Sequence, residues 1–219
     1  MLLAVAAPAA PQVFSSGPEQ VRLVELFTSE GCSSCPPAEQ WLGELREQPG
    51  LWRDFVPVAL HVVYWDRLGW KDRFASRSFT DRQYAYGERW GSGSVYTPCF
   101  VLDGQEWRDR RPPARGGPTG RLEAVVADGR CHVSFAATAD GVTVAWLGGG
   151  IASEVKRGEN AGRTLRHEFL ALALASAPLA DGKAEITLPV VPTGVGRLAL
   201  AVWVTRAGKP VQATGGWMD

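Results

Sequence analysis

Two cysteines separated by two serines, Cys32 and Cys35, constrain this chain more than any other feature of its sequence. They follow an apolar run at residues 23–27, which has the composition of a buried strand, and a turn at residues 29–31. After the cysteines, apolar residues recur at helical spacing: Ala38, Trp41, Leu42 and Leu45. A strand, a tight turn, two cysteines and a helix are the arrangement of a dithiol redox site.

The predicted place of Cys32, at or just before the first helical turn, favours its thiolate. Unpaired backbone N–H groups and the positive end of the helix dipole stabilise a negative charge there. A thiol that ionises readily is also the better attacking group at neutral pH. Cys35 lies one turn further along and is suited to resolving a mixed disulfide, while Pro36 fits the first turn of a helix. We therefore predict Cys32 and Cys35 as the catalytic pair of a thiol–disulfide exchange.

Two other uses of this cysteine pair are considered, and the spacing of the remaining ligands argues against the first. Half of a zinc site would need a second pair of Cys or His at similar spacing, but the remaining cysteines are far apart and the three histidines are isolated in the sequence. We therefore expect no metal site and no cofactor. A purely structural disulfide is the other alternative, because proteins outside the cytoplasm use such bonds freely.

Composition narrows the choice of partner. The chain has 219 residues, and its 23 Lys and Arg balance its 23 Asp and Glu, so charge gives no reason to expect nucleic acid or an anionic membrane surface. No stretch approaches the roughly 20 apolar residues that a membrane span requires. We expect the partner to be a disulfide or dithiol substrate, or a protein redox partner.

The beginning of the chain predicts its compartment. Residues 1–10 are apolar and rich in alanine, which is typical of the end of a secretory signal that lacks its basic first segment; a plain Ala/Pro tail is the alternative. Residues 11–20 read as a linker, so we assign 1–20 to a signal remnant or linker. Four cysteines, an even number, suit an oxidising compartment. We predict a periplasmic or secreted protein.

A second buried strand is predicted at residues 55–65, where a continuous apolar run suits a parallel strand covered on both faces. With the preceding strand and helix it would form a right-handed βαβ unit. His61, within this run, is interpreted as a core histidine rather than a catalytic one. The aromatic loop at residues 65–72 either lines a substrate groove or anchors itself to the core. A helix is predicted at residues 79–90.

A Thr-Pro pair and a hairpin follow. Asp103-Gly104 between two strand-like runs is a strong hairpin signal, and Thr97-Pro98 stands just before it. The order of Cys-x-x-Cys helix, strand, helix, Thr-Pro and hairpin resembles the thioredoxin and glutaredoxin superfamily. The resemblance implies that Pro98 is a cis proline facing the dithiol and that Thr97 offers its backbone to substrate. It also implies proton transfer by Glu25, with a surface carboxylate as the alternative because the register differs by one residue.

A narrower resemblance covers residues 20–205. Residues 27–38, 61–66, 69–72, 96–98 and 157–160 are similar to a family of secreted bacterial thioredoxin-like proteins of unknown function. Against that family's pattern, Cys99 is a departure that places a third thiol after the Thr-Pro. It could form an alternative disulfide or bind Cu(I) together with the Cys32–Cys35 pair. The plainer interpretations are a buried strand cysteine or a structural bond to Cys131.

From Arg130 onwards the pattern changes to short alternating runs separated by turn signals. They predict antiparallel strands at residues 131–136, 142–147, 167–174, 184–188 and 198–205. Just before them, residues 121–127 are expected to be a helix that ends at Asp128-Gly129. The polar loop at residues 157–163 is interpreted mainly as an exposed turn.

These expectations combine into one prediction. The fold class is α/β: a thioredoxin-like mixed sheet flanked by helices at residues 21–129, with a helical insertion at 66–94, and a C-terminal antiparallel β-sandwich elaboration at 130–219. The predicted function is thiol–disulfide exchange on protein or small-molecule disulfides outside the cytoplasm. The alternatives are a non-catalytic binding module with a structural disulfide, and a Cu(I)-handling protein that uses Cys32, Cys35 and Cys99.

Overall fold

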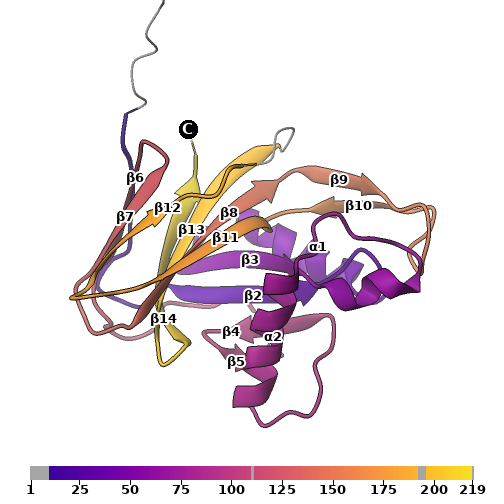
Figure 1. The fold of residues 1–219 in the computed structure, drawn as a ribbon, viewed down its shortest axis with the longest axis horizontal. Coiled ribbons are helices and arrows are strands. Elements are labelled where there is room, and N and C mark those ends of the chain that lie inside the picture. The colour runs from indigo at the N-terminus through magenta and orange to yellow at the C-terminus, as the bar shows by residue number, and fades with distance from the viewer. Residues whose placement is uncertain (1–9, 110, 192–195, 219) are drawn as a thin grey trace, which may run out of the picture.

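The computed structural model describes residues 10–109, 111–191 and 196–218. Nine of the ten residues assigned to a signal remnant, 1–9, lie outside this range. Strands account for 44% of the structure and helices for 15%. The prediction of a thioredoxin-like α/β fold flanked by helices, with a separate sandwich, is therefore wrong: the fold is rich in β structure, with large mixed and antiparallel sheets (Figure 1).

In the part of the chain that the structure describes, all helical segments come from the first half. They are α1 (Pro36–Glu44), α2 (Arg77–Arg89) and the 3-10 helices η1 (Leu45–Glu47) and η2 (Val63–Leu68). α1 begins with Pro36 at its first position, as the sequence predicts, because proline's missing N–H has no helical partner there in any case. α2 confirms the predicted helix at residues 79–90 within two residues at its start.

The strands run through the whole described chain. They are β1 (Gln12–Ser15), β2 (Arg22–Thr28), β3 (Phe55–His61), β4 (Cys99–Leu102), β5 (Gln105–Glu106), β6 (Leu122–Ala127), β7 (Arg130–Phe135), β8 (Gly141–Gly149), β9 (Ile151–Glu154), β10 (Thr164–His167), β11 (Leu170–Pro178), β12 (Lys183–Thr187), β13 (Arg197–Arg206) and β14 (Lys209–Trp217). The two buried strands predicted around the first helix are confirmed as β2 and β3, which pair in parallel, but β3 ends at His61 and residues 63–65 of the predicted strand belong to η2.

A single mixed sheet joins the two halves of the chain. Among the described residues it has eight strands in the order β14-β13-β8-β11-β3-β2-β4-β5. The junction is the parallel pairing of β11 with β3, where Leu170 lies opposite Ala59. The C-terminal strands β8, β11, β13 and β14 thus continue the sheet of β2 and β3.

The edge of this sheet formed by β14 explains why few helices are needed to cover β2 and β3. β14 returns to contact β2 and β3, and the side chain of Gln212 on β14 accepts a hydrogen bond from the backbone N–H of Val21 at 2.7 Å. Strands that are apolar on both faces need cover on both faces. Here the curled sheet covers one face of these strands, as a second layer of helices would in an α/β fold. α1 and α2 contribute Leu42 and Tyr86 to the same core.

A second, antiparallel sheet packs against the C-terminal strands. Within the described chain its order is β1-β6-β7-β12, and its apolar side chains form a core with those of β8 and β13. The predicted helix at residues 121–127 is wrong, because this segment is β6. Seven residues are too few for a stable isolated helix, whereas neighbouring valines suit a strand. Asp128 (φ 49°) and Gly129 (φ 73°) form the tight turn of the β6–β7 hairpin.

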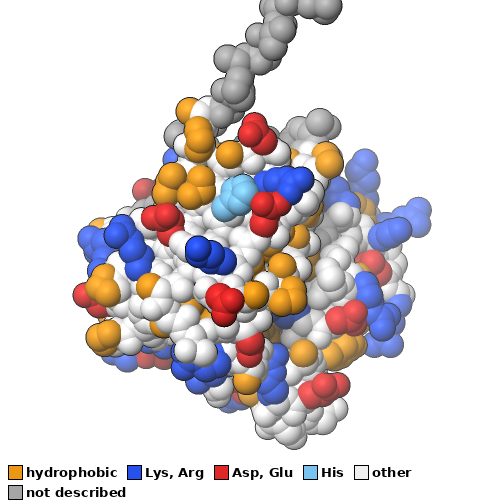
Figure 2. Space-filling model, turned by 60° about the vertical axis from the view of Figure 1, so that its left-hand side comes forward, with side chains coloured by type: hydrophobic (Ala, Val, Ile, Leu, Met, Phe, Trp, Pro, Cys, Tyr) orange, Lys and Arg blue, Asp and Glu red, His pale blue; other side chains and the backbone are white. Residues whose placement is uncertain are grey.

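The surface matches the balanced composition. Figure 2 shows basic, acidic and hydrophobic side chains interspersed over one face of the molecule. In the described residues, no helix is both long enough and apolar enough to cross a membrane.

Candidate functional site

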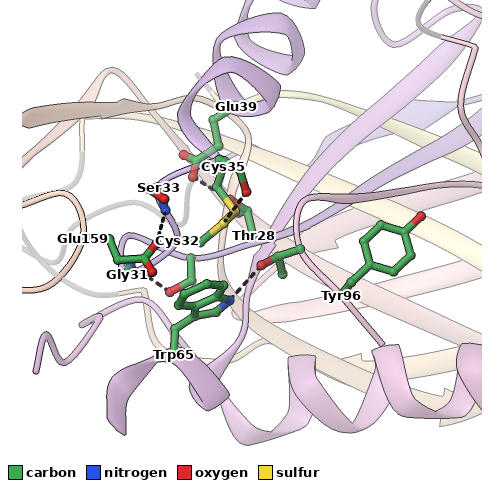
Figure 3. Close-up of a disulfide and its surroundings, with 12 residues drawn as sticks. Thr28, Gly31, Cys32, Ser33, Cys35, Glu39, Trp65, Tyr96 and Glu159 are labelled. Carbon is green, nitrogen blue, oxygen red and sulfur yellow. Dashed lines mark hydrogen bonds between the residues drawn. A yellow bond between two sulfur atoms is a disulfide. The ribbon is translucent and has the colours of Figure 1, made fainter. Parts of the chain in front are cut away.

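The candidate site is a disulfide between Cys32 and Cys35, at the junction of β2 and α1 (Figure 3). The two Cα atoms lie 5.4 Å apart. Residues 29–35, here called the disulfide loop, follow the C-terminal end of β2. Cys35 is the residue that caps α1, so the bond closes on the N-terminus of that helix, where a negative charge is stabilised. The Sγ of Cys32 also contacts the hydroxyl of Ser34 at 3.4 Å.

The segment with Thr97 and Pro98 leads into the neighbouring strand, β4, at the same end of the sheet. Phe27 on β2 pairs with Cys99 on β4, so Thr97-Pro98 precedes β4 beside the residues that lead into the disulfide loop. The Thr97–Pro98 peptide bond is cis, as the family resemblance implies. The Asp103-Gly104 hairpin is confirmed as the turn between β4 and β5.

Trp65 spans the space between these two segments. Its Cβ lies against Gly31, where an added Cβ would come within 3.0 Å of it. Its ring Nε1–H donates to Thr97 Oγ1 at 2.7 Å (Figure 3). Trp65 therefore joins the disulfide loop to the Thr97-Pro98 segment. The contact is compatible with both interpretations of the aromatic loop, lining a substrate groove and anchoring itself to the core.

The loop between β9 and β10 clamps the disulfide loop from another side. Asn160 donates from its side-chain amide to the carbonyl oxygens of Glu30 and Cys32, at 2.9 Å each. The carboxylate of Glu159 accepts the backbone N–H of Ser33 at 3.0 Å (Figure 3). Residues 157–163 are exposed, as predicted, except for Asn160, which is fully buried and ties the loop to the disulfide loop.

The disulfide is buried where the β9–β10 loop and Trp65 contact the disulfide loop. Cys32 and Cys35 are both 0% exposed. An attacking thiolate must reach one sulfur along the axis of the S–S bond, so exchange at this site requires the surroundings of the disulfide to open.

Glu25 is buried, and its interpretation as a surface carboxylate is wrong. It lies on β2 and accepts hydrogen bonds from Arg82 Nε and from the hydroxyl of Tyr86, both at 2.6 Å. Burial alone would lower the pKa of Arg82, but the negative charge of Glu25 raises it. Its role in proton transfer stays a prediction.

The other two cysteines are free, so the structural bond between Cys99 and Cys131 is excluded. Cys99 is a buried strand cysteine on β4, whereas Cys131 belongs to the core under the second sheet. Burial raises the pKa of Cys99 to about 11 and that of Cys131 to about 12, which keeps both thiols protonated at neutral pH. A Cu(I) site that includes Cys99 stays a prediction.

Two histidines that are isolated in the sequence meet beneath the disulfide loop. The rings of His61 and His167 have centroids 5.1 Å apart, and both side chains are fully buried. His61 Nδ1 donates to Asp72 at 2.7 Å. Burial alone would raise the pKa of Asp72, but the charge of His61 and its hydrogen bond lower it to about 2.

Two glutamates complete this cluster. His167 Nδ1 bonds Glu39 Oε2 at 2.6 Å, and its Nε2 faces Glu30 Oε1 at 3.2 Å. Burial alone would lower the pKa of His167, but these hydrogen bonds raise it to about 9. We call Glu30, Glu39, His61, Asp72 and His167 the buried polar cluster.

Sequence reasoning identified His61 only as a core residue and missed the other members of the cluster. For Glu39 a signal existed, since Cys35, Glu39 and Leu42 share one face of α1 and the helix buries Glu39 with Leu42. No local pattern marks His167, because its partners come from distant segments.

Comparisons with known proteins identify a family without an assigned role. A family model described as "Protein of unknown function (DUF1223)" matches residues 23–205. The solved structure of protein AGR_C_4864 from Agrobacterium tumefaciens is similar, with 25% identity over 91% of this chain and 95% of that chain and a TM-score of 0.65. HBP35 of Porphyromonas gingivalis is similar at 13% identity, over 93% of this chain and 77% of that one, with a TM-score of 0.57. None of the curated proteins compared with the chain matches it.

Proposed function

Because the chain belongs to the DUF1223 family, whose function is unknown, its role must be argued from its own site, and we propose that it is a thiol–disulfide oxidoreductase acting through Cys32 and Cys35. The observation that carries the proposal is the disulfide closed at the N-terminus of α1. That position stabilises a thiolate when the bond is reduced.

The short span of the bond also favours a chemical role. A disulfide that closes only about four residues restricts the unfolded chain by about 2 kcal/mol, against about 3 kcal/mol for a 15-residue loop. A structural disulfide at this place would therefore contribute less stability than one that closes a longer loop.

The exchange proceeds in two steps. The Cys32 thiolate attacks one sulfur of a substrate disulfide, a mixed disulfide forms, and the other substrate sulfur leaves as a thiolate. The Cys35 thiolate then attacks Cys32 Sγ and releases the second substrate thiolate. The substrate gains two electrons and the protein is oxidised to the disulfide; the reverse order oxidises a substrate dithiol. The reduction potential sets the direction.

Thr97 and Pro98 border the dithiol in this proposal and supply backbone contacts to an extended substrate. Glu25, which is ion-paired with Arg82, is the candidate for proton transfer in this proposal. The proposal includes a compartment outside the cytoplasm, periplasmic or secreted, where a disulfide persists in the resting protein.

A structural disulfide in a binding module is the second candidate, and the complete burial of both sulfurs favours it. The two candidates differ in one measurable property. A working pair has a reduction potential within the range of cellular dithiol partners, whereas an inert structural bond falls below about −300 mV.

A redox titration against glutathione, combined with trapping, tests the proposal. We expect a potential above about −300 mV, and we expect the Cys35→Ser protein to accumulate mixed disulfides through Cys32 with a model disulfide peptide. Cys131→Ser is the matched control, since it removes a buried thiol elsewhere. A potential below about −300 mV together with no trapped adduct would instead support the structural disulfide.

Trp65 controls access in this proposal, which gives a prediction for Trp65→Ala. We expect the rate at which dithiothreitol reduces the Cys32–Cys35 bond to rise at least about tenfold, because the variant removes the ring held between Gly31 and Thr97. The measurement is the rate of thiol release under native conditions. Trp217→Ala removes a half-buried tryptophan near Trp52 and Phe169 and should leave the rate unchanged. Equal rates in all three proteins would show that Trp65 does not limit access.

A further inference from the structure

The buried polar cluster contains a group of side chains whose donor atoms converge on one point. Glu39, His61 and His167 each offer one ligand atom, and these atoms lie within 4.8 Å of one another. All three residues are buried. We propose that these residues form a binding site for a divalent transition metal ion, with Zn²⁺ as the ion that best fits two imidazoles and one carboxylate.

The strongest observation is an unpartnered nitrogen. His61 Nε2 is buried and has no hydrogen-bond partner among the described residues. It lies 3.9 Å from Glu39 Oε2, too far for a hydrogen bond. A buried polar atom without a partner is costly, and a metal ion at this position would satisfy it.

The outer contacts orient both rings for metal binding. His61 Nδ1 donates to Asp72, which directs its free Nε2 toward Glu39. His167 Nε2 faces Glu30, which directs Nδ1 toward the same carboxylate. In known metal sites, the histidine ligands almost always donate their second ring N–H to a carboxylate or carbonyl in this way.

Glu39 is held in place by Thr28, which donates to its Oε1 at 2.7 Å and leaves Oε2 facing the histidines. Tetrahedral zinc with bonds of about 2.0–2.1 Å separates neighbouring ligand atoms by roughly 3.3 Å. The observed separations from Glu39 Oε2, 2.6 Å to His167 Nδ1 and 3.9 Å to His61 Nε2, bracket that value. Binding would replace the proton between His167 and Glu39 and, from the charged form of His61, the proton on its Nε2; both protons pass to solvent.

A groove supplies the route to the site. It lies between α1 and the β9–β10 hairpin, has a volume of about 730 Å³, and is lined by Pro36, Glu39 and Leu165 among others. Glu39 is 7% exposed and is the member of the ligand set that reaches this groove. Three protein ligands with one position left open are typical of catalytic rather than structural zinc sites.

The test uses the full chain without an affinity tag, with its disulfide intact so that Cys32 and Cys35 cannot act as ligands. Zn²⁺ is titrated in competition with a chromophoric chelator, and Co²⁺ is added separately to record its visible spectrum. We expect one Zn²⁺ per chain and a Co²⁺ spectrum with nitrogen and oxygen ligands and without a thiolate charge-transfer band. This spectrum decides between the proposed ligands and the free thiols without any variant.

Variants assign the ligands. Glu39→Gln keeps the shape of the side chain and should weaken Zn²⁺ binding at least about 100-fold, and Asp72→Asn should weaken it about 10–100-fold through His61. His132→Asn is the matched control, because His132 is an exposed histidine beside Glu185. This variant should bind Zn²⁺ with the affinity of the unaltered protein. No stoichiometric binding to the unaltered protein, a thiolate spectrum, or equal affinities in Glu39→Gln and His132→Asn would overturn the proposal.

Discussion

Replacing Arg82 with methionine should cost about 3–5 kcal/mol of unfolding free energy, because it leaves the carboxylate of Glu25 buried and uncompensated. Glu25 is 0% exposed and has Arg82 and Tyr86 as its hydrogen-bond partners. The guanidinium of Arg82 also lies over the ring of Trp203, 5.0 Å from its centroid. The pair therefore connects α2, β2 and β13, and the measurement is urea unfolding followed by circular dichroism.

Two controls isolate the buried pair. Arg77→Ala breaks an exposed ion pair with Asp81 on the same helix and should cost less than about 0.5 kcal/mol. In the double variant Glu25→Met with Arg82→Met, the loss should be smaller than the sum of the two single losses, since no uncompensated charge remains. A loss below about 1 kcal/mol in Arg82→Met would contradict the prediction.

Trp203→Ala should cost about 3–5 kcal/mol, because Trp203 is among the largest fully buried side chains. It comes from β13 but packs in the same core as Leu26 of β2 and Leu60 of β3. We therefore expect amide hydrogen exchange to accelerate in β3 as much as in β13. Hydrogen exchange followed by NMR gives both values in one experiment.

A milder variant and a surface control accompany this test. Trp203→Phe retains most of the ring and keeps the protein folded if the alanine variant does not fold. Val190→Ala changes a side chain that is 93% exposed and should stay within about 0.5 kcal/mol of the unaltered protein. If β13 lost protection while β3 kept it, the two halves of the sheet would unfold separately, as two domains divided near residue 130 would.

The local elements were predictable from the sequence to different degrees. β2, α1, β3, α2 and the Asp103-Gly104 hairpin lie where their patterns place them, because each depends on spacing within a short window. β6 was mistaken for a helix because its apolar residues fit a helical face as well as a strand. β14 was missed, since its Gly-rich C-terminal half and proline lack the usual strand composition.

The prediction of the fold class was wrong for a non-local reason. Residues 23–27 and 55–61 are apolar enough to be covered on both faces, but their composition does not state what covers them. In this protein part of that cover comes from β14, at the opposite end of the chain from β2. A family resemblance based on the cysteine and Thr-Pro motifs could not show this.

The sequence by itself determined the disulfide pair, the helix that starts beside it and the Thr97-Pro98 segment, because neighbours in the chain decide these features. Tertiary structure alone decided that Trp65 and Asn160 contact the disulfide loop and that Glu39, His61 and His167 converge. These contacts join residues from separate strands and loops. Their distances depend on how the sheet pairs and curls, and no local spacing contains that information.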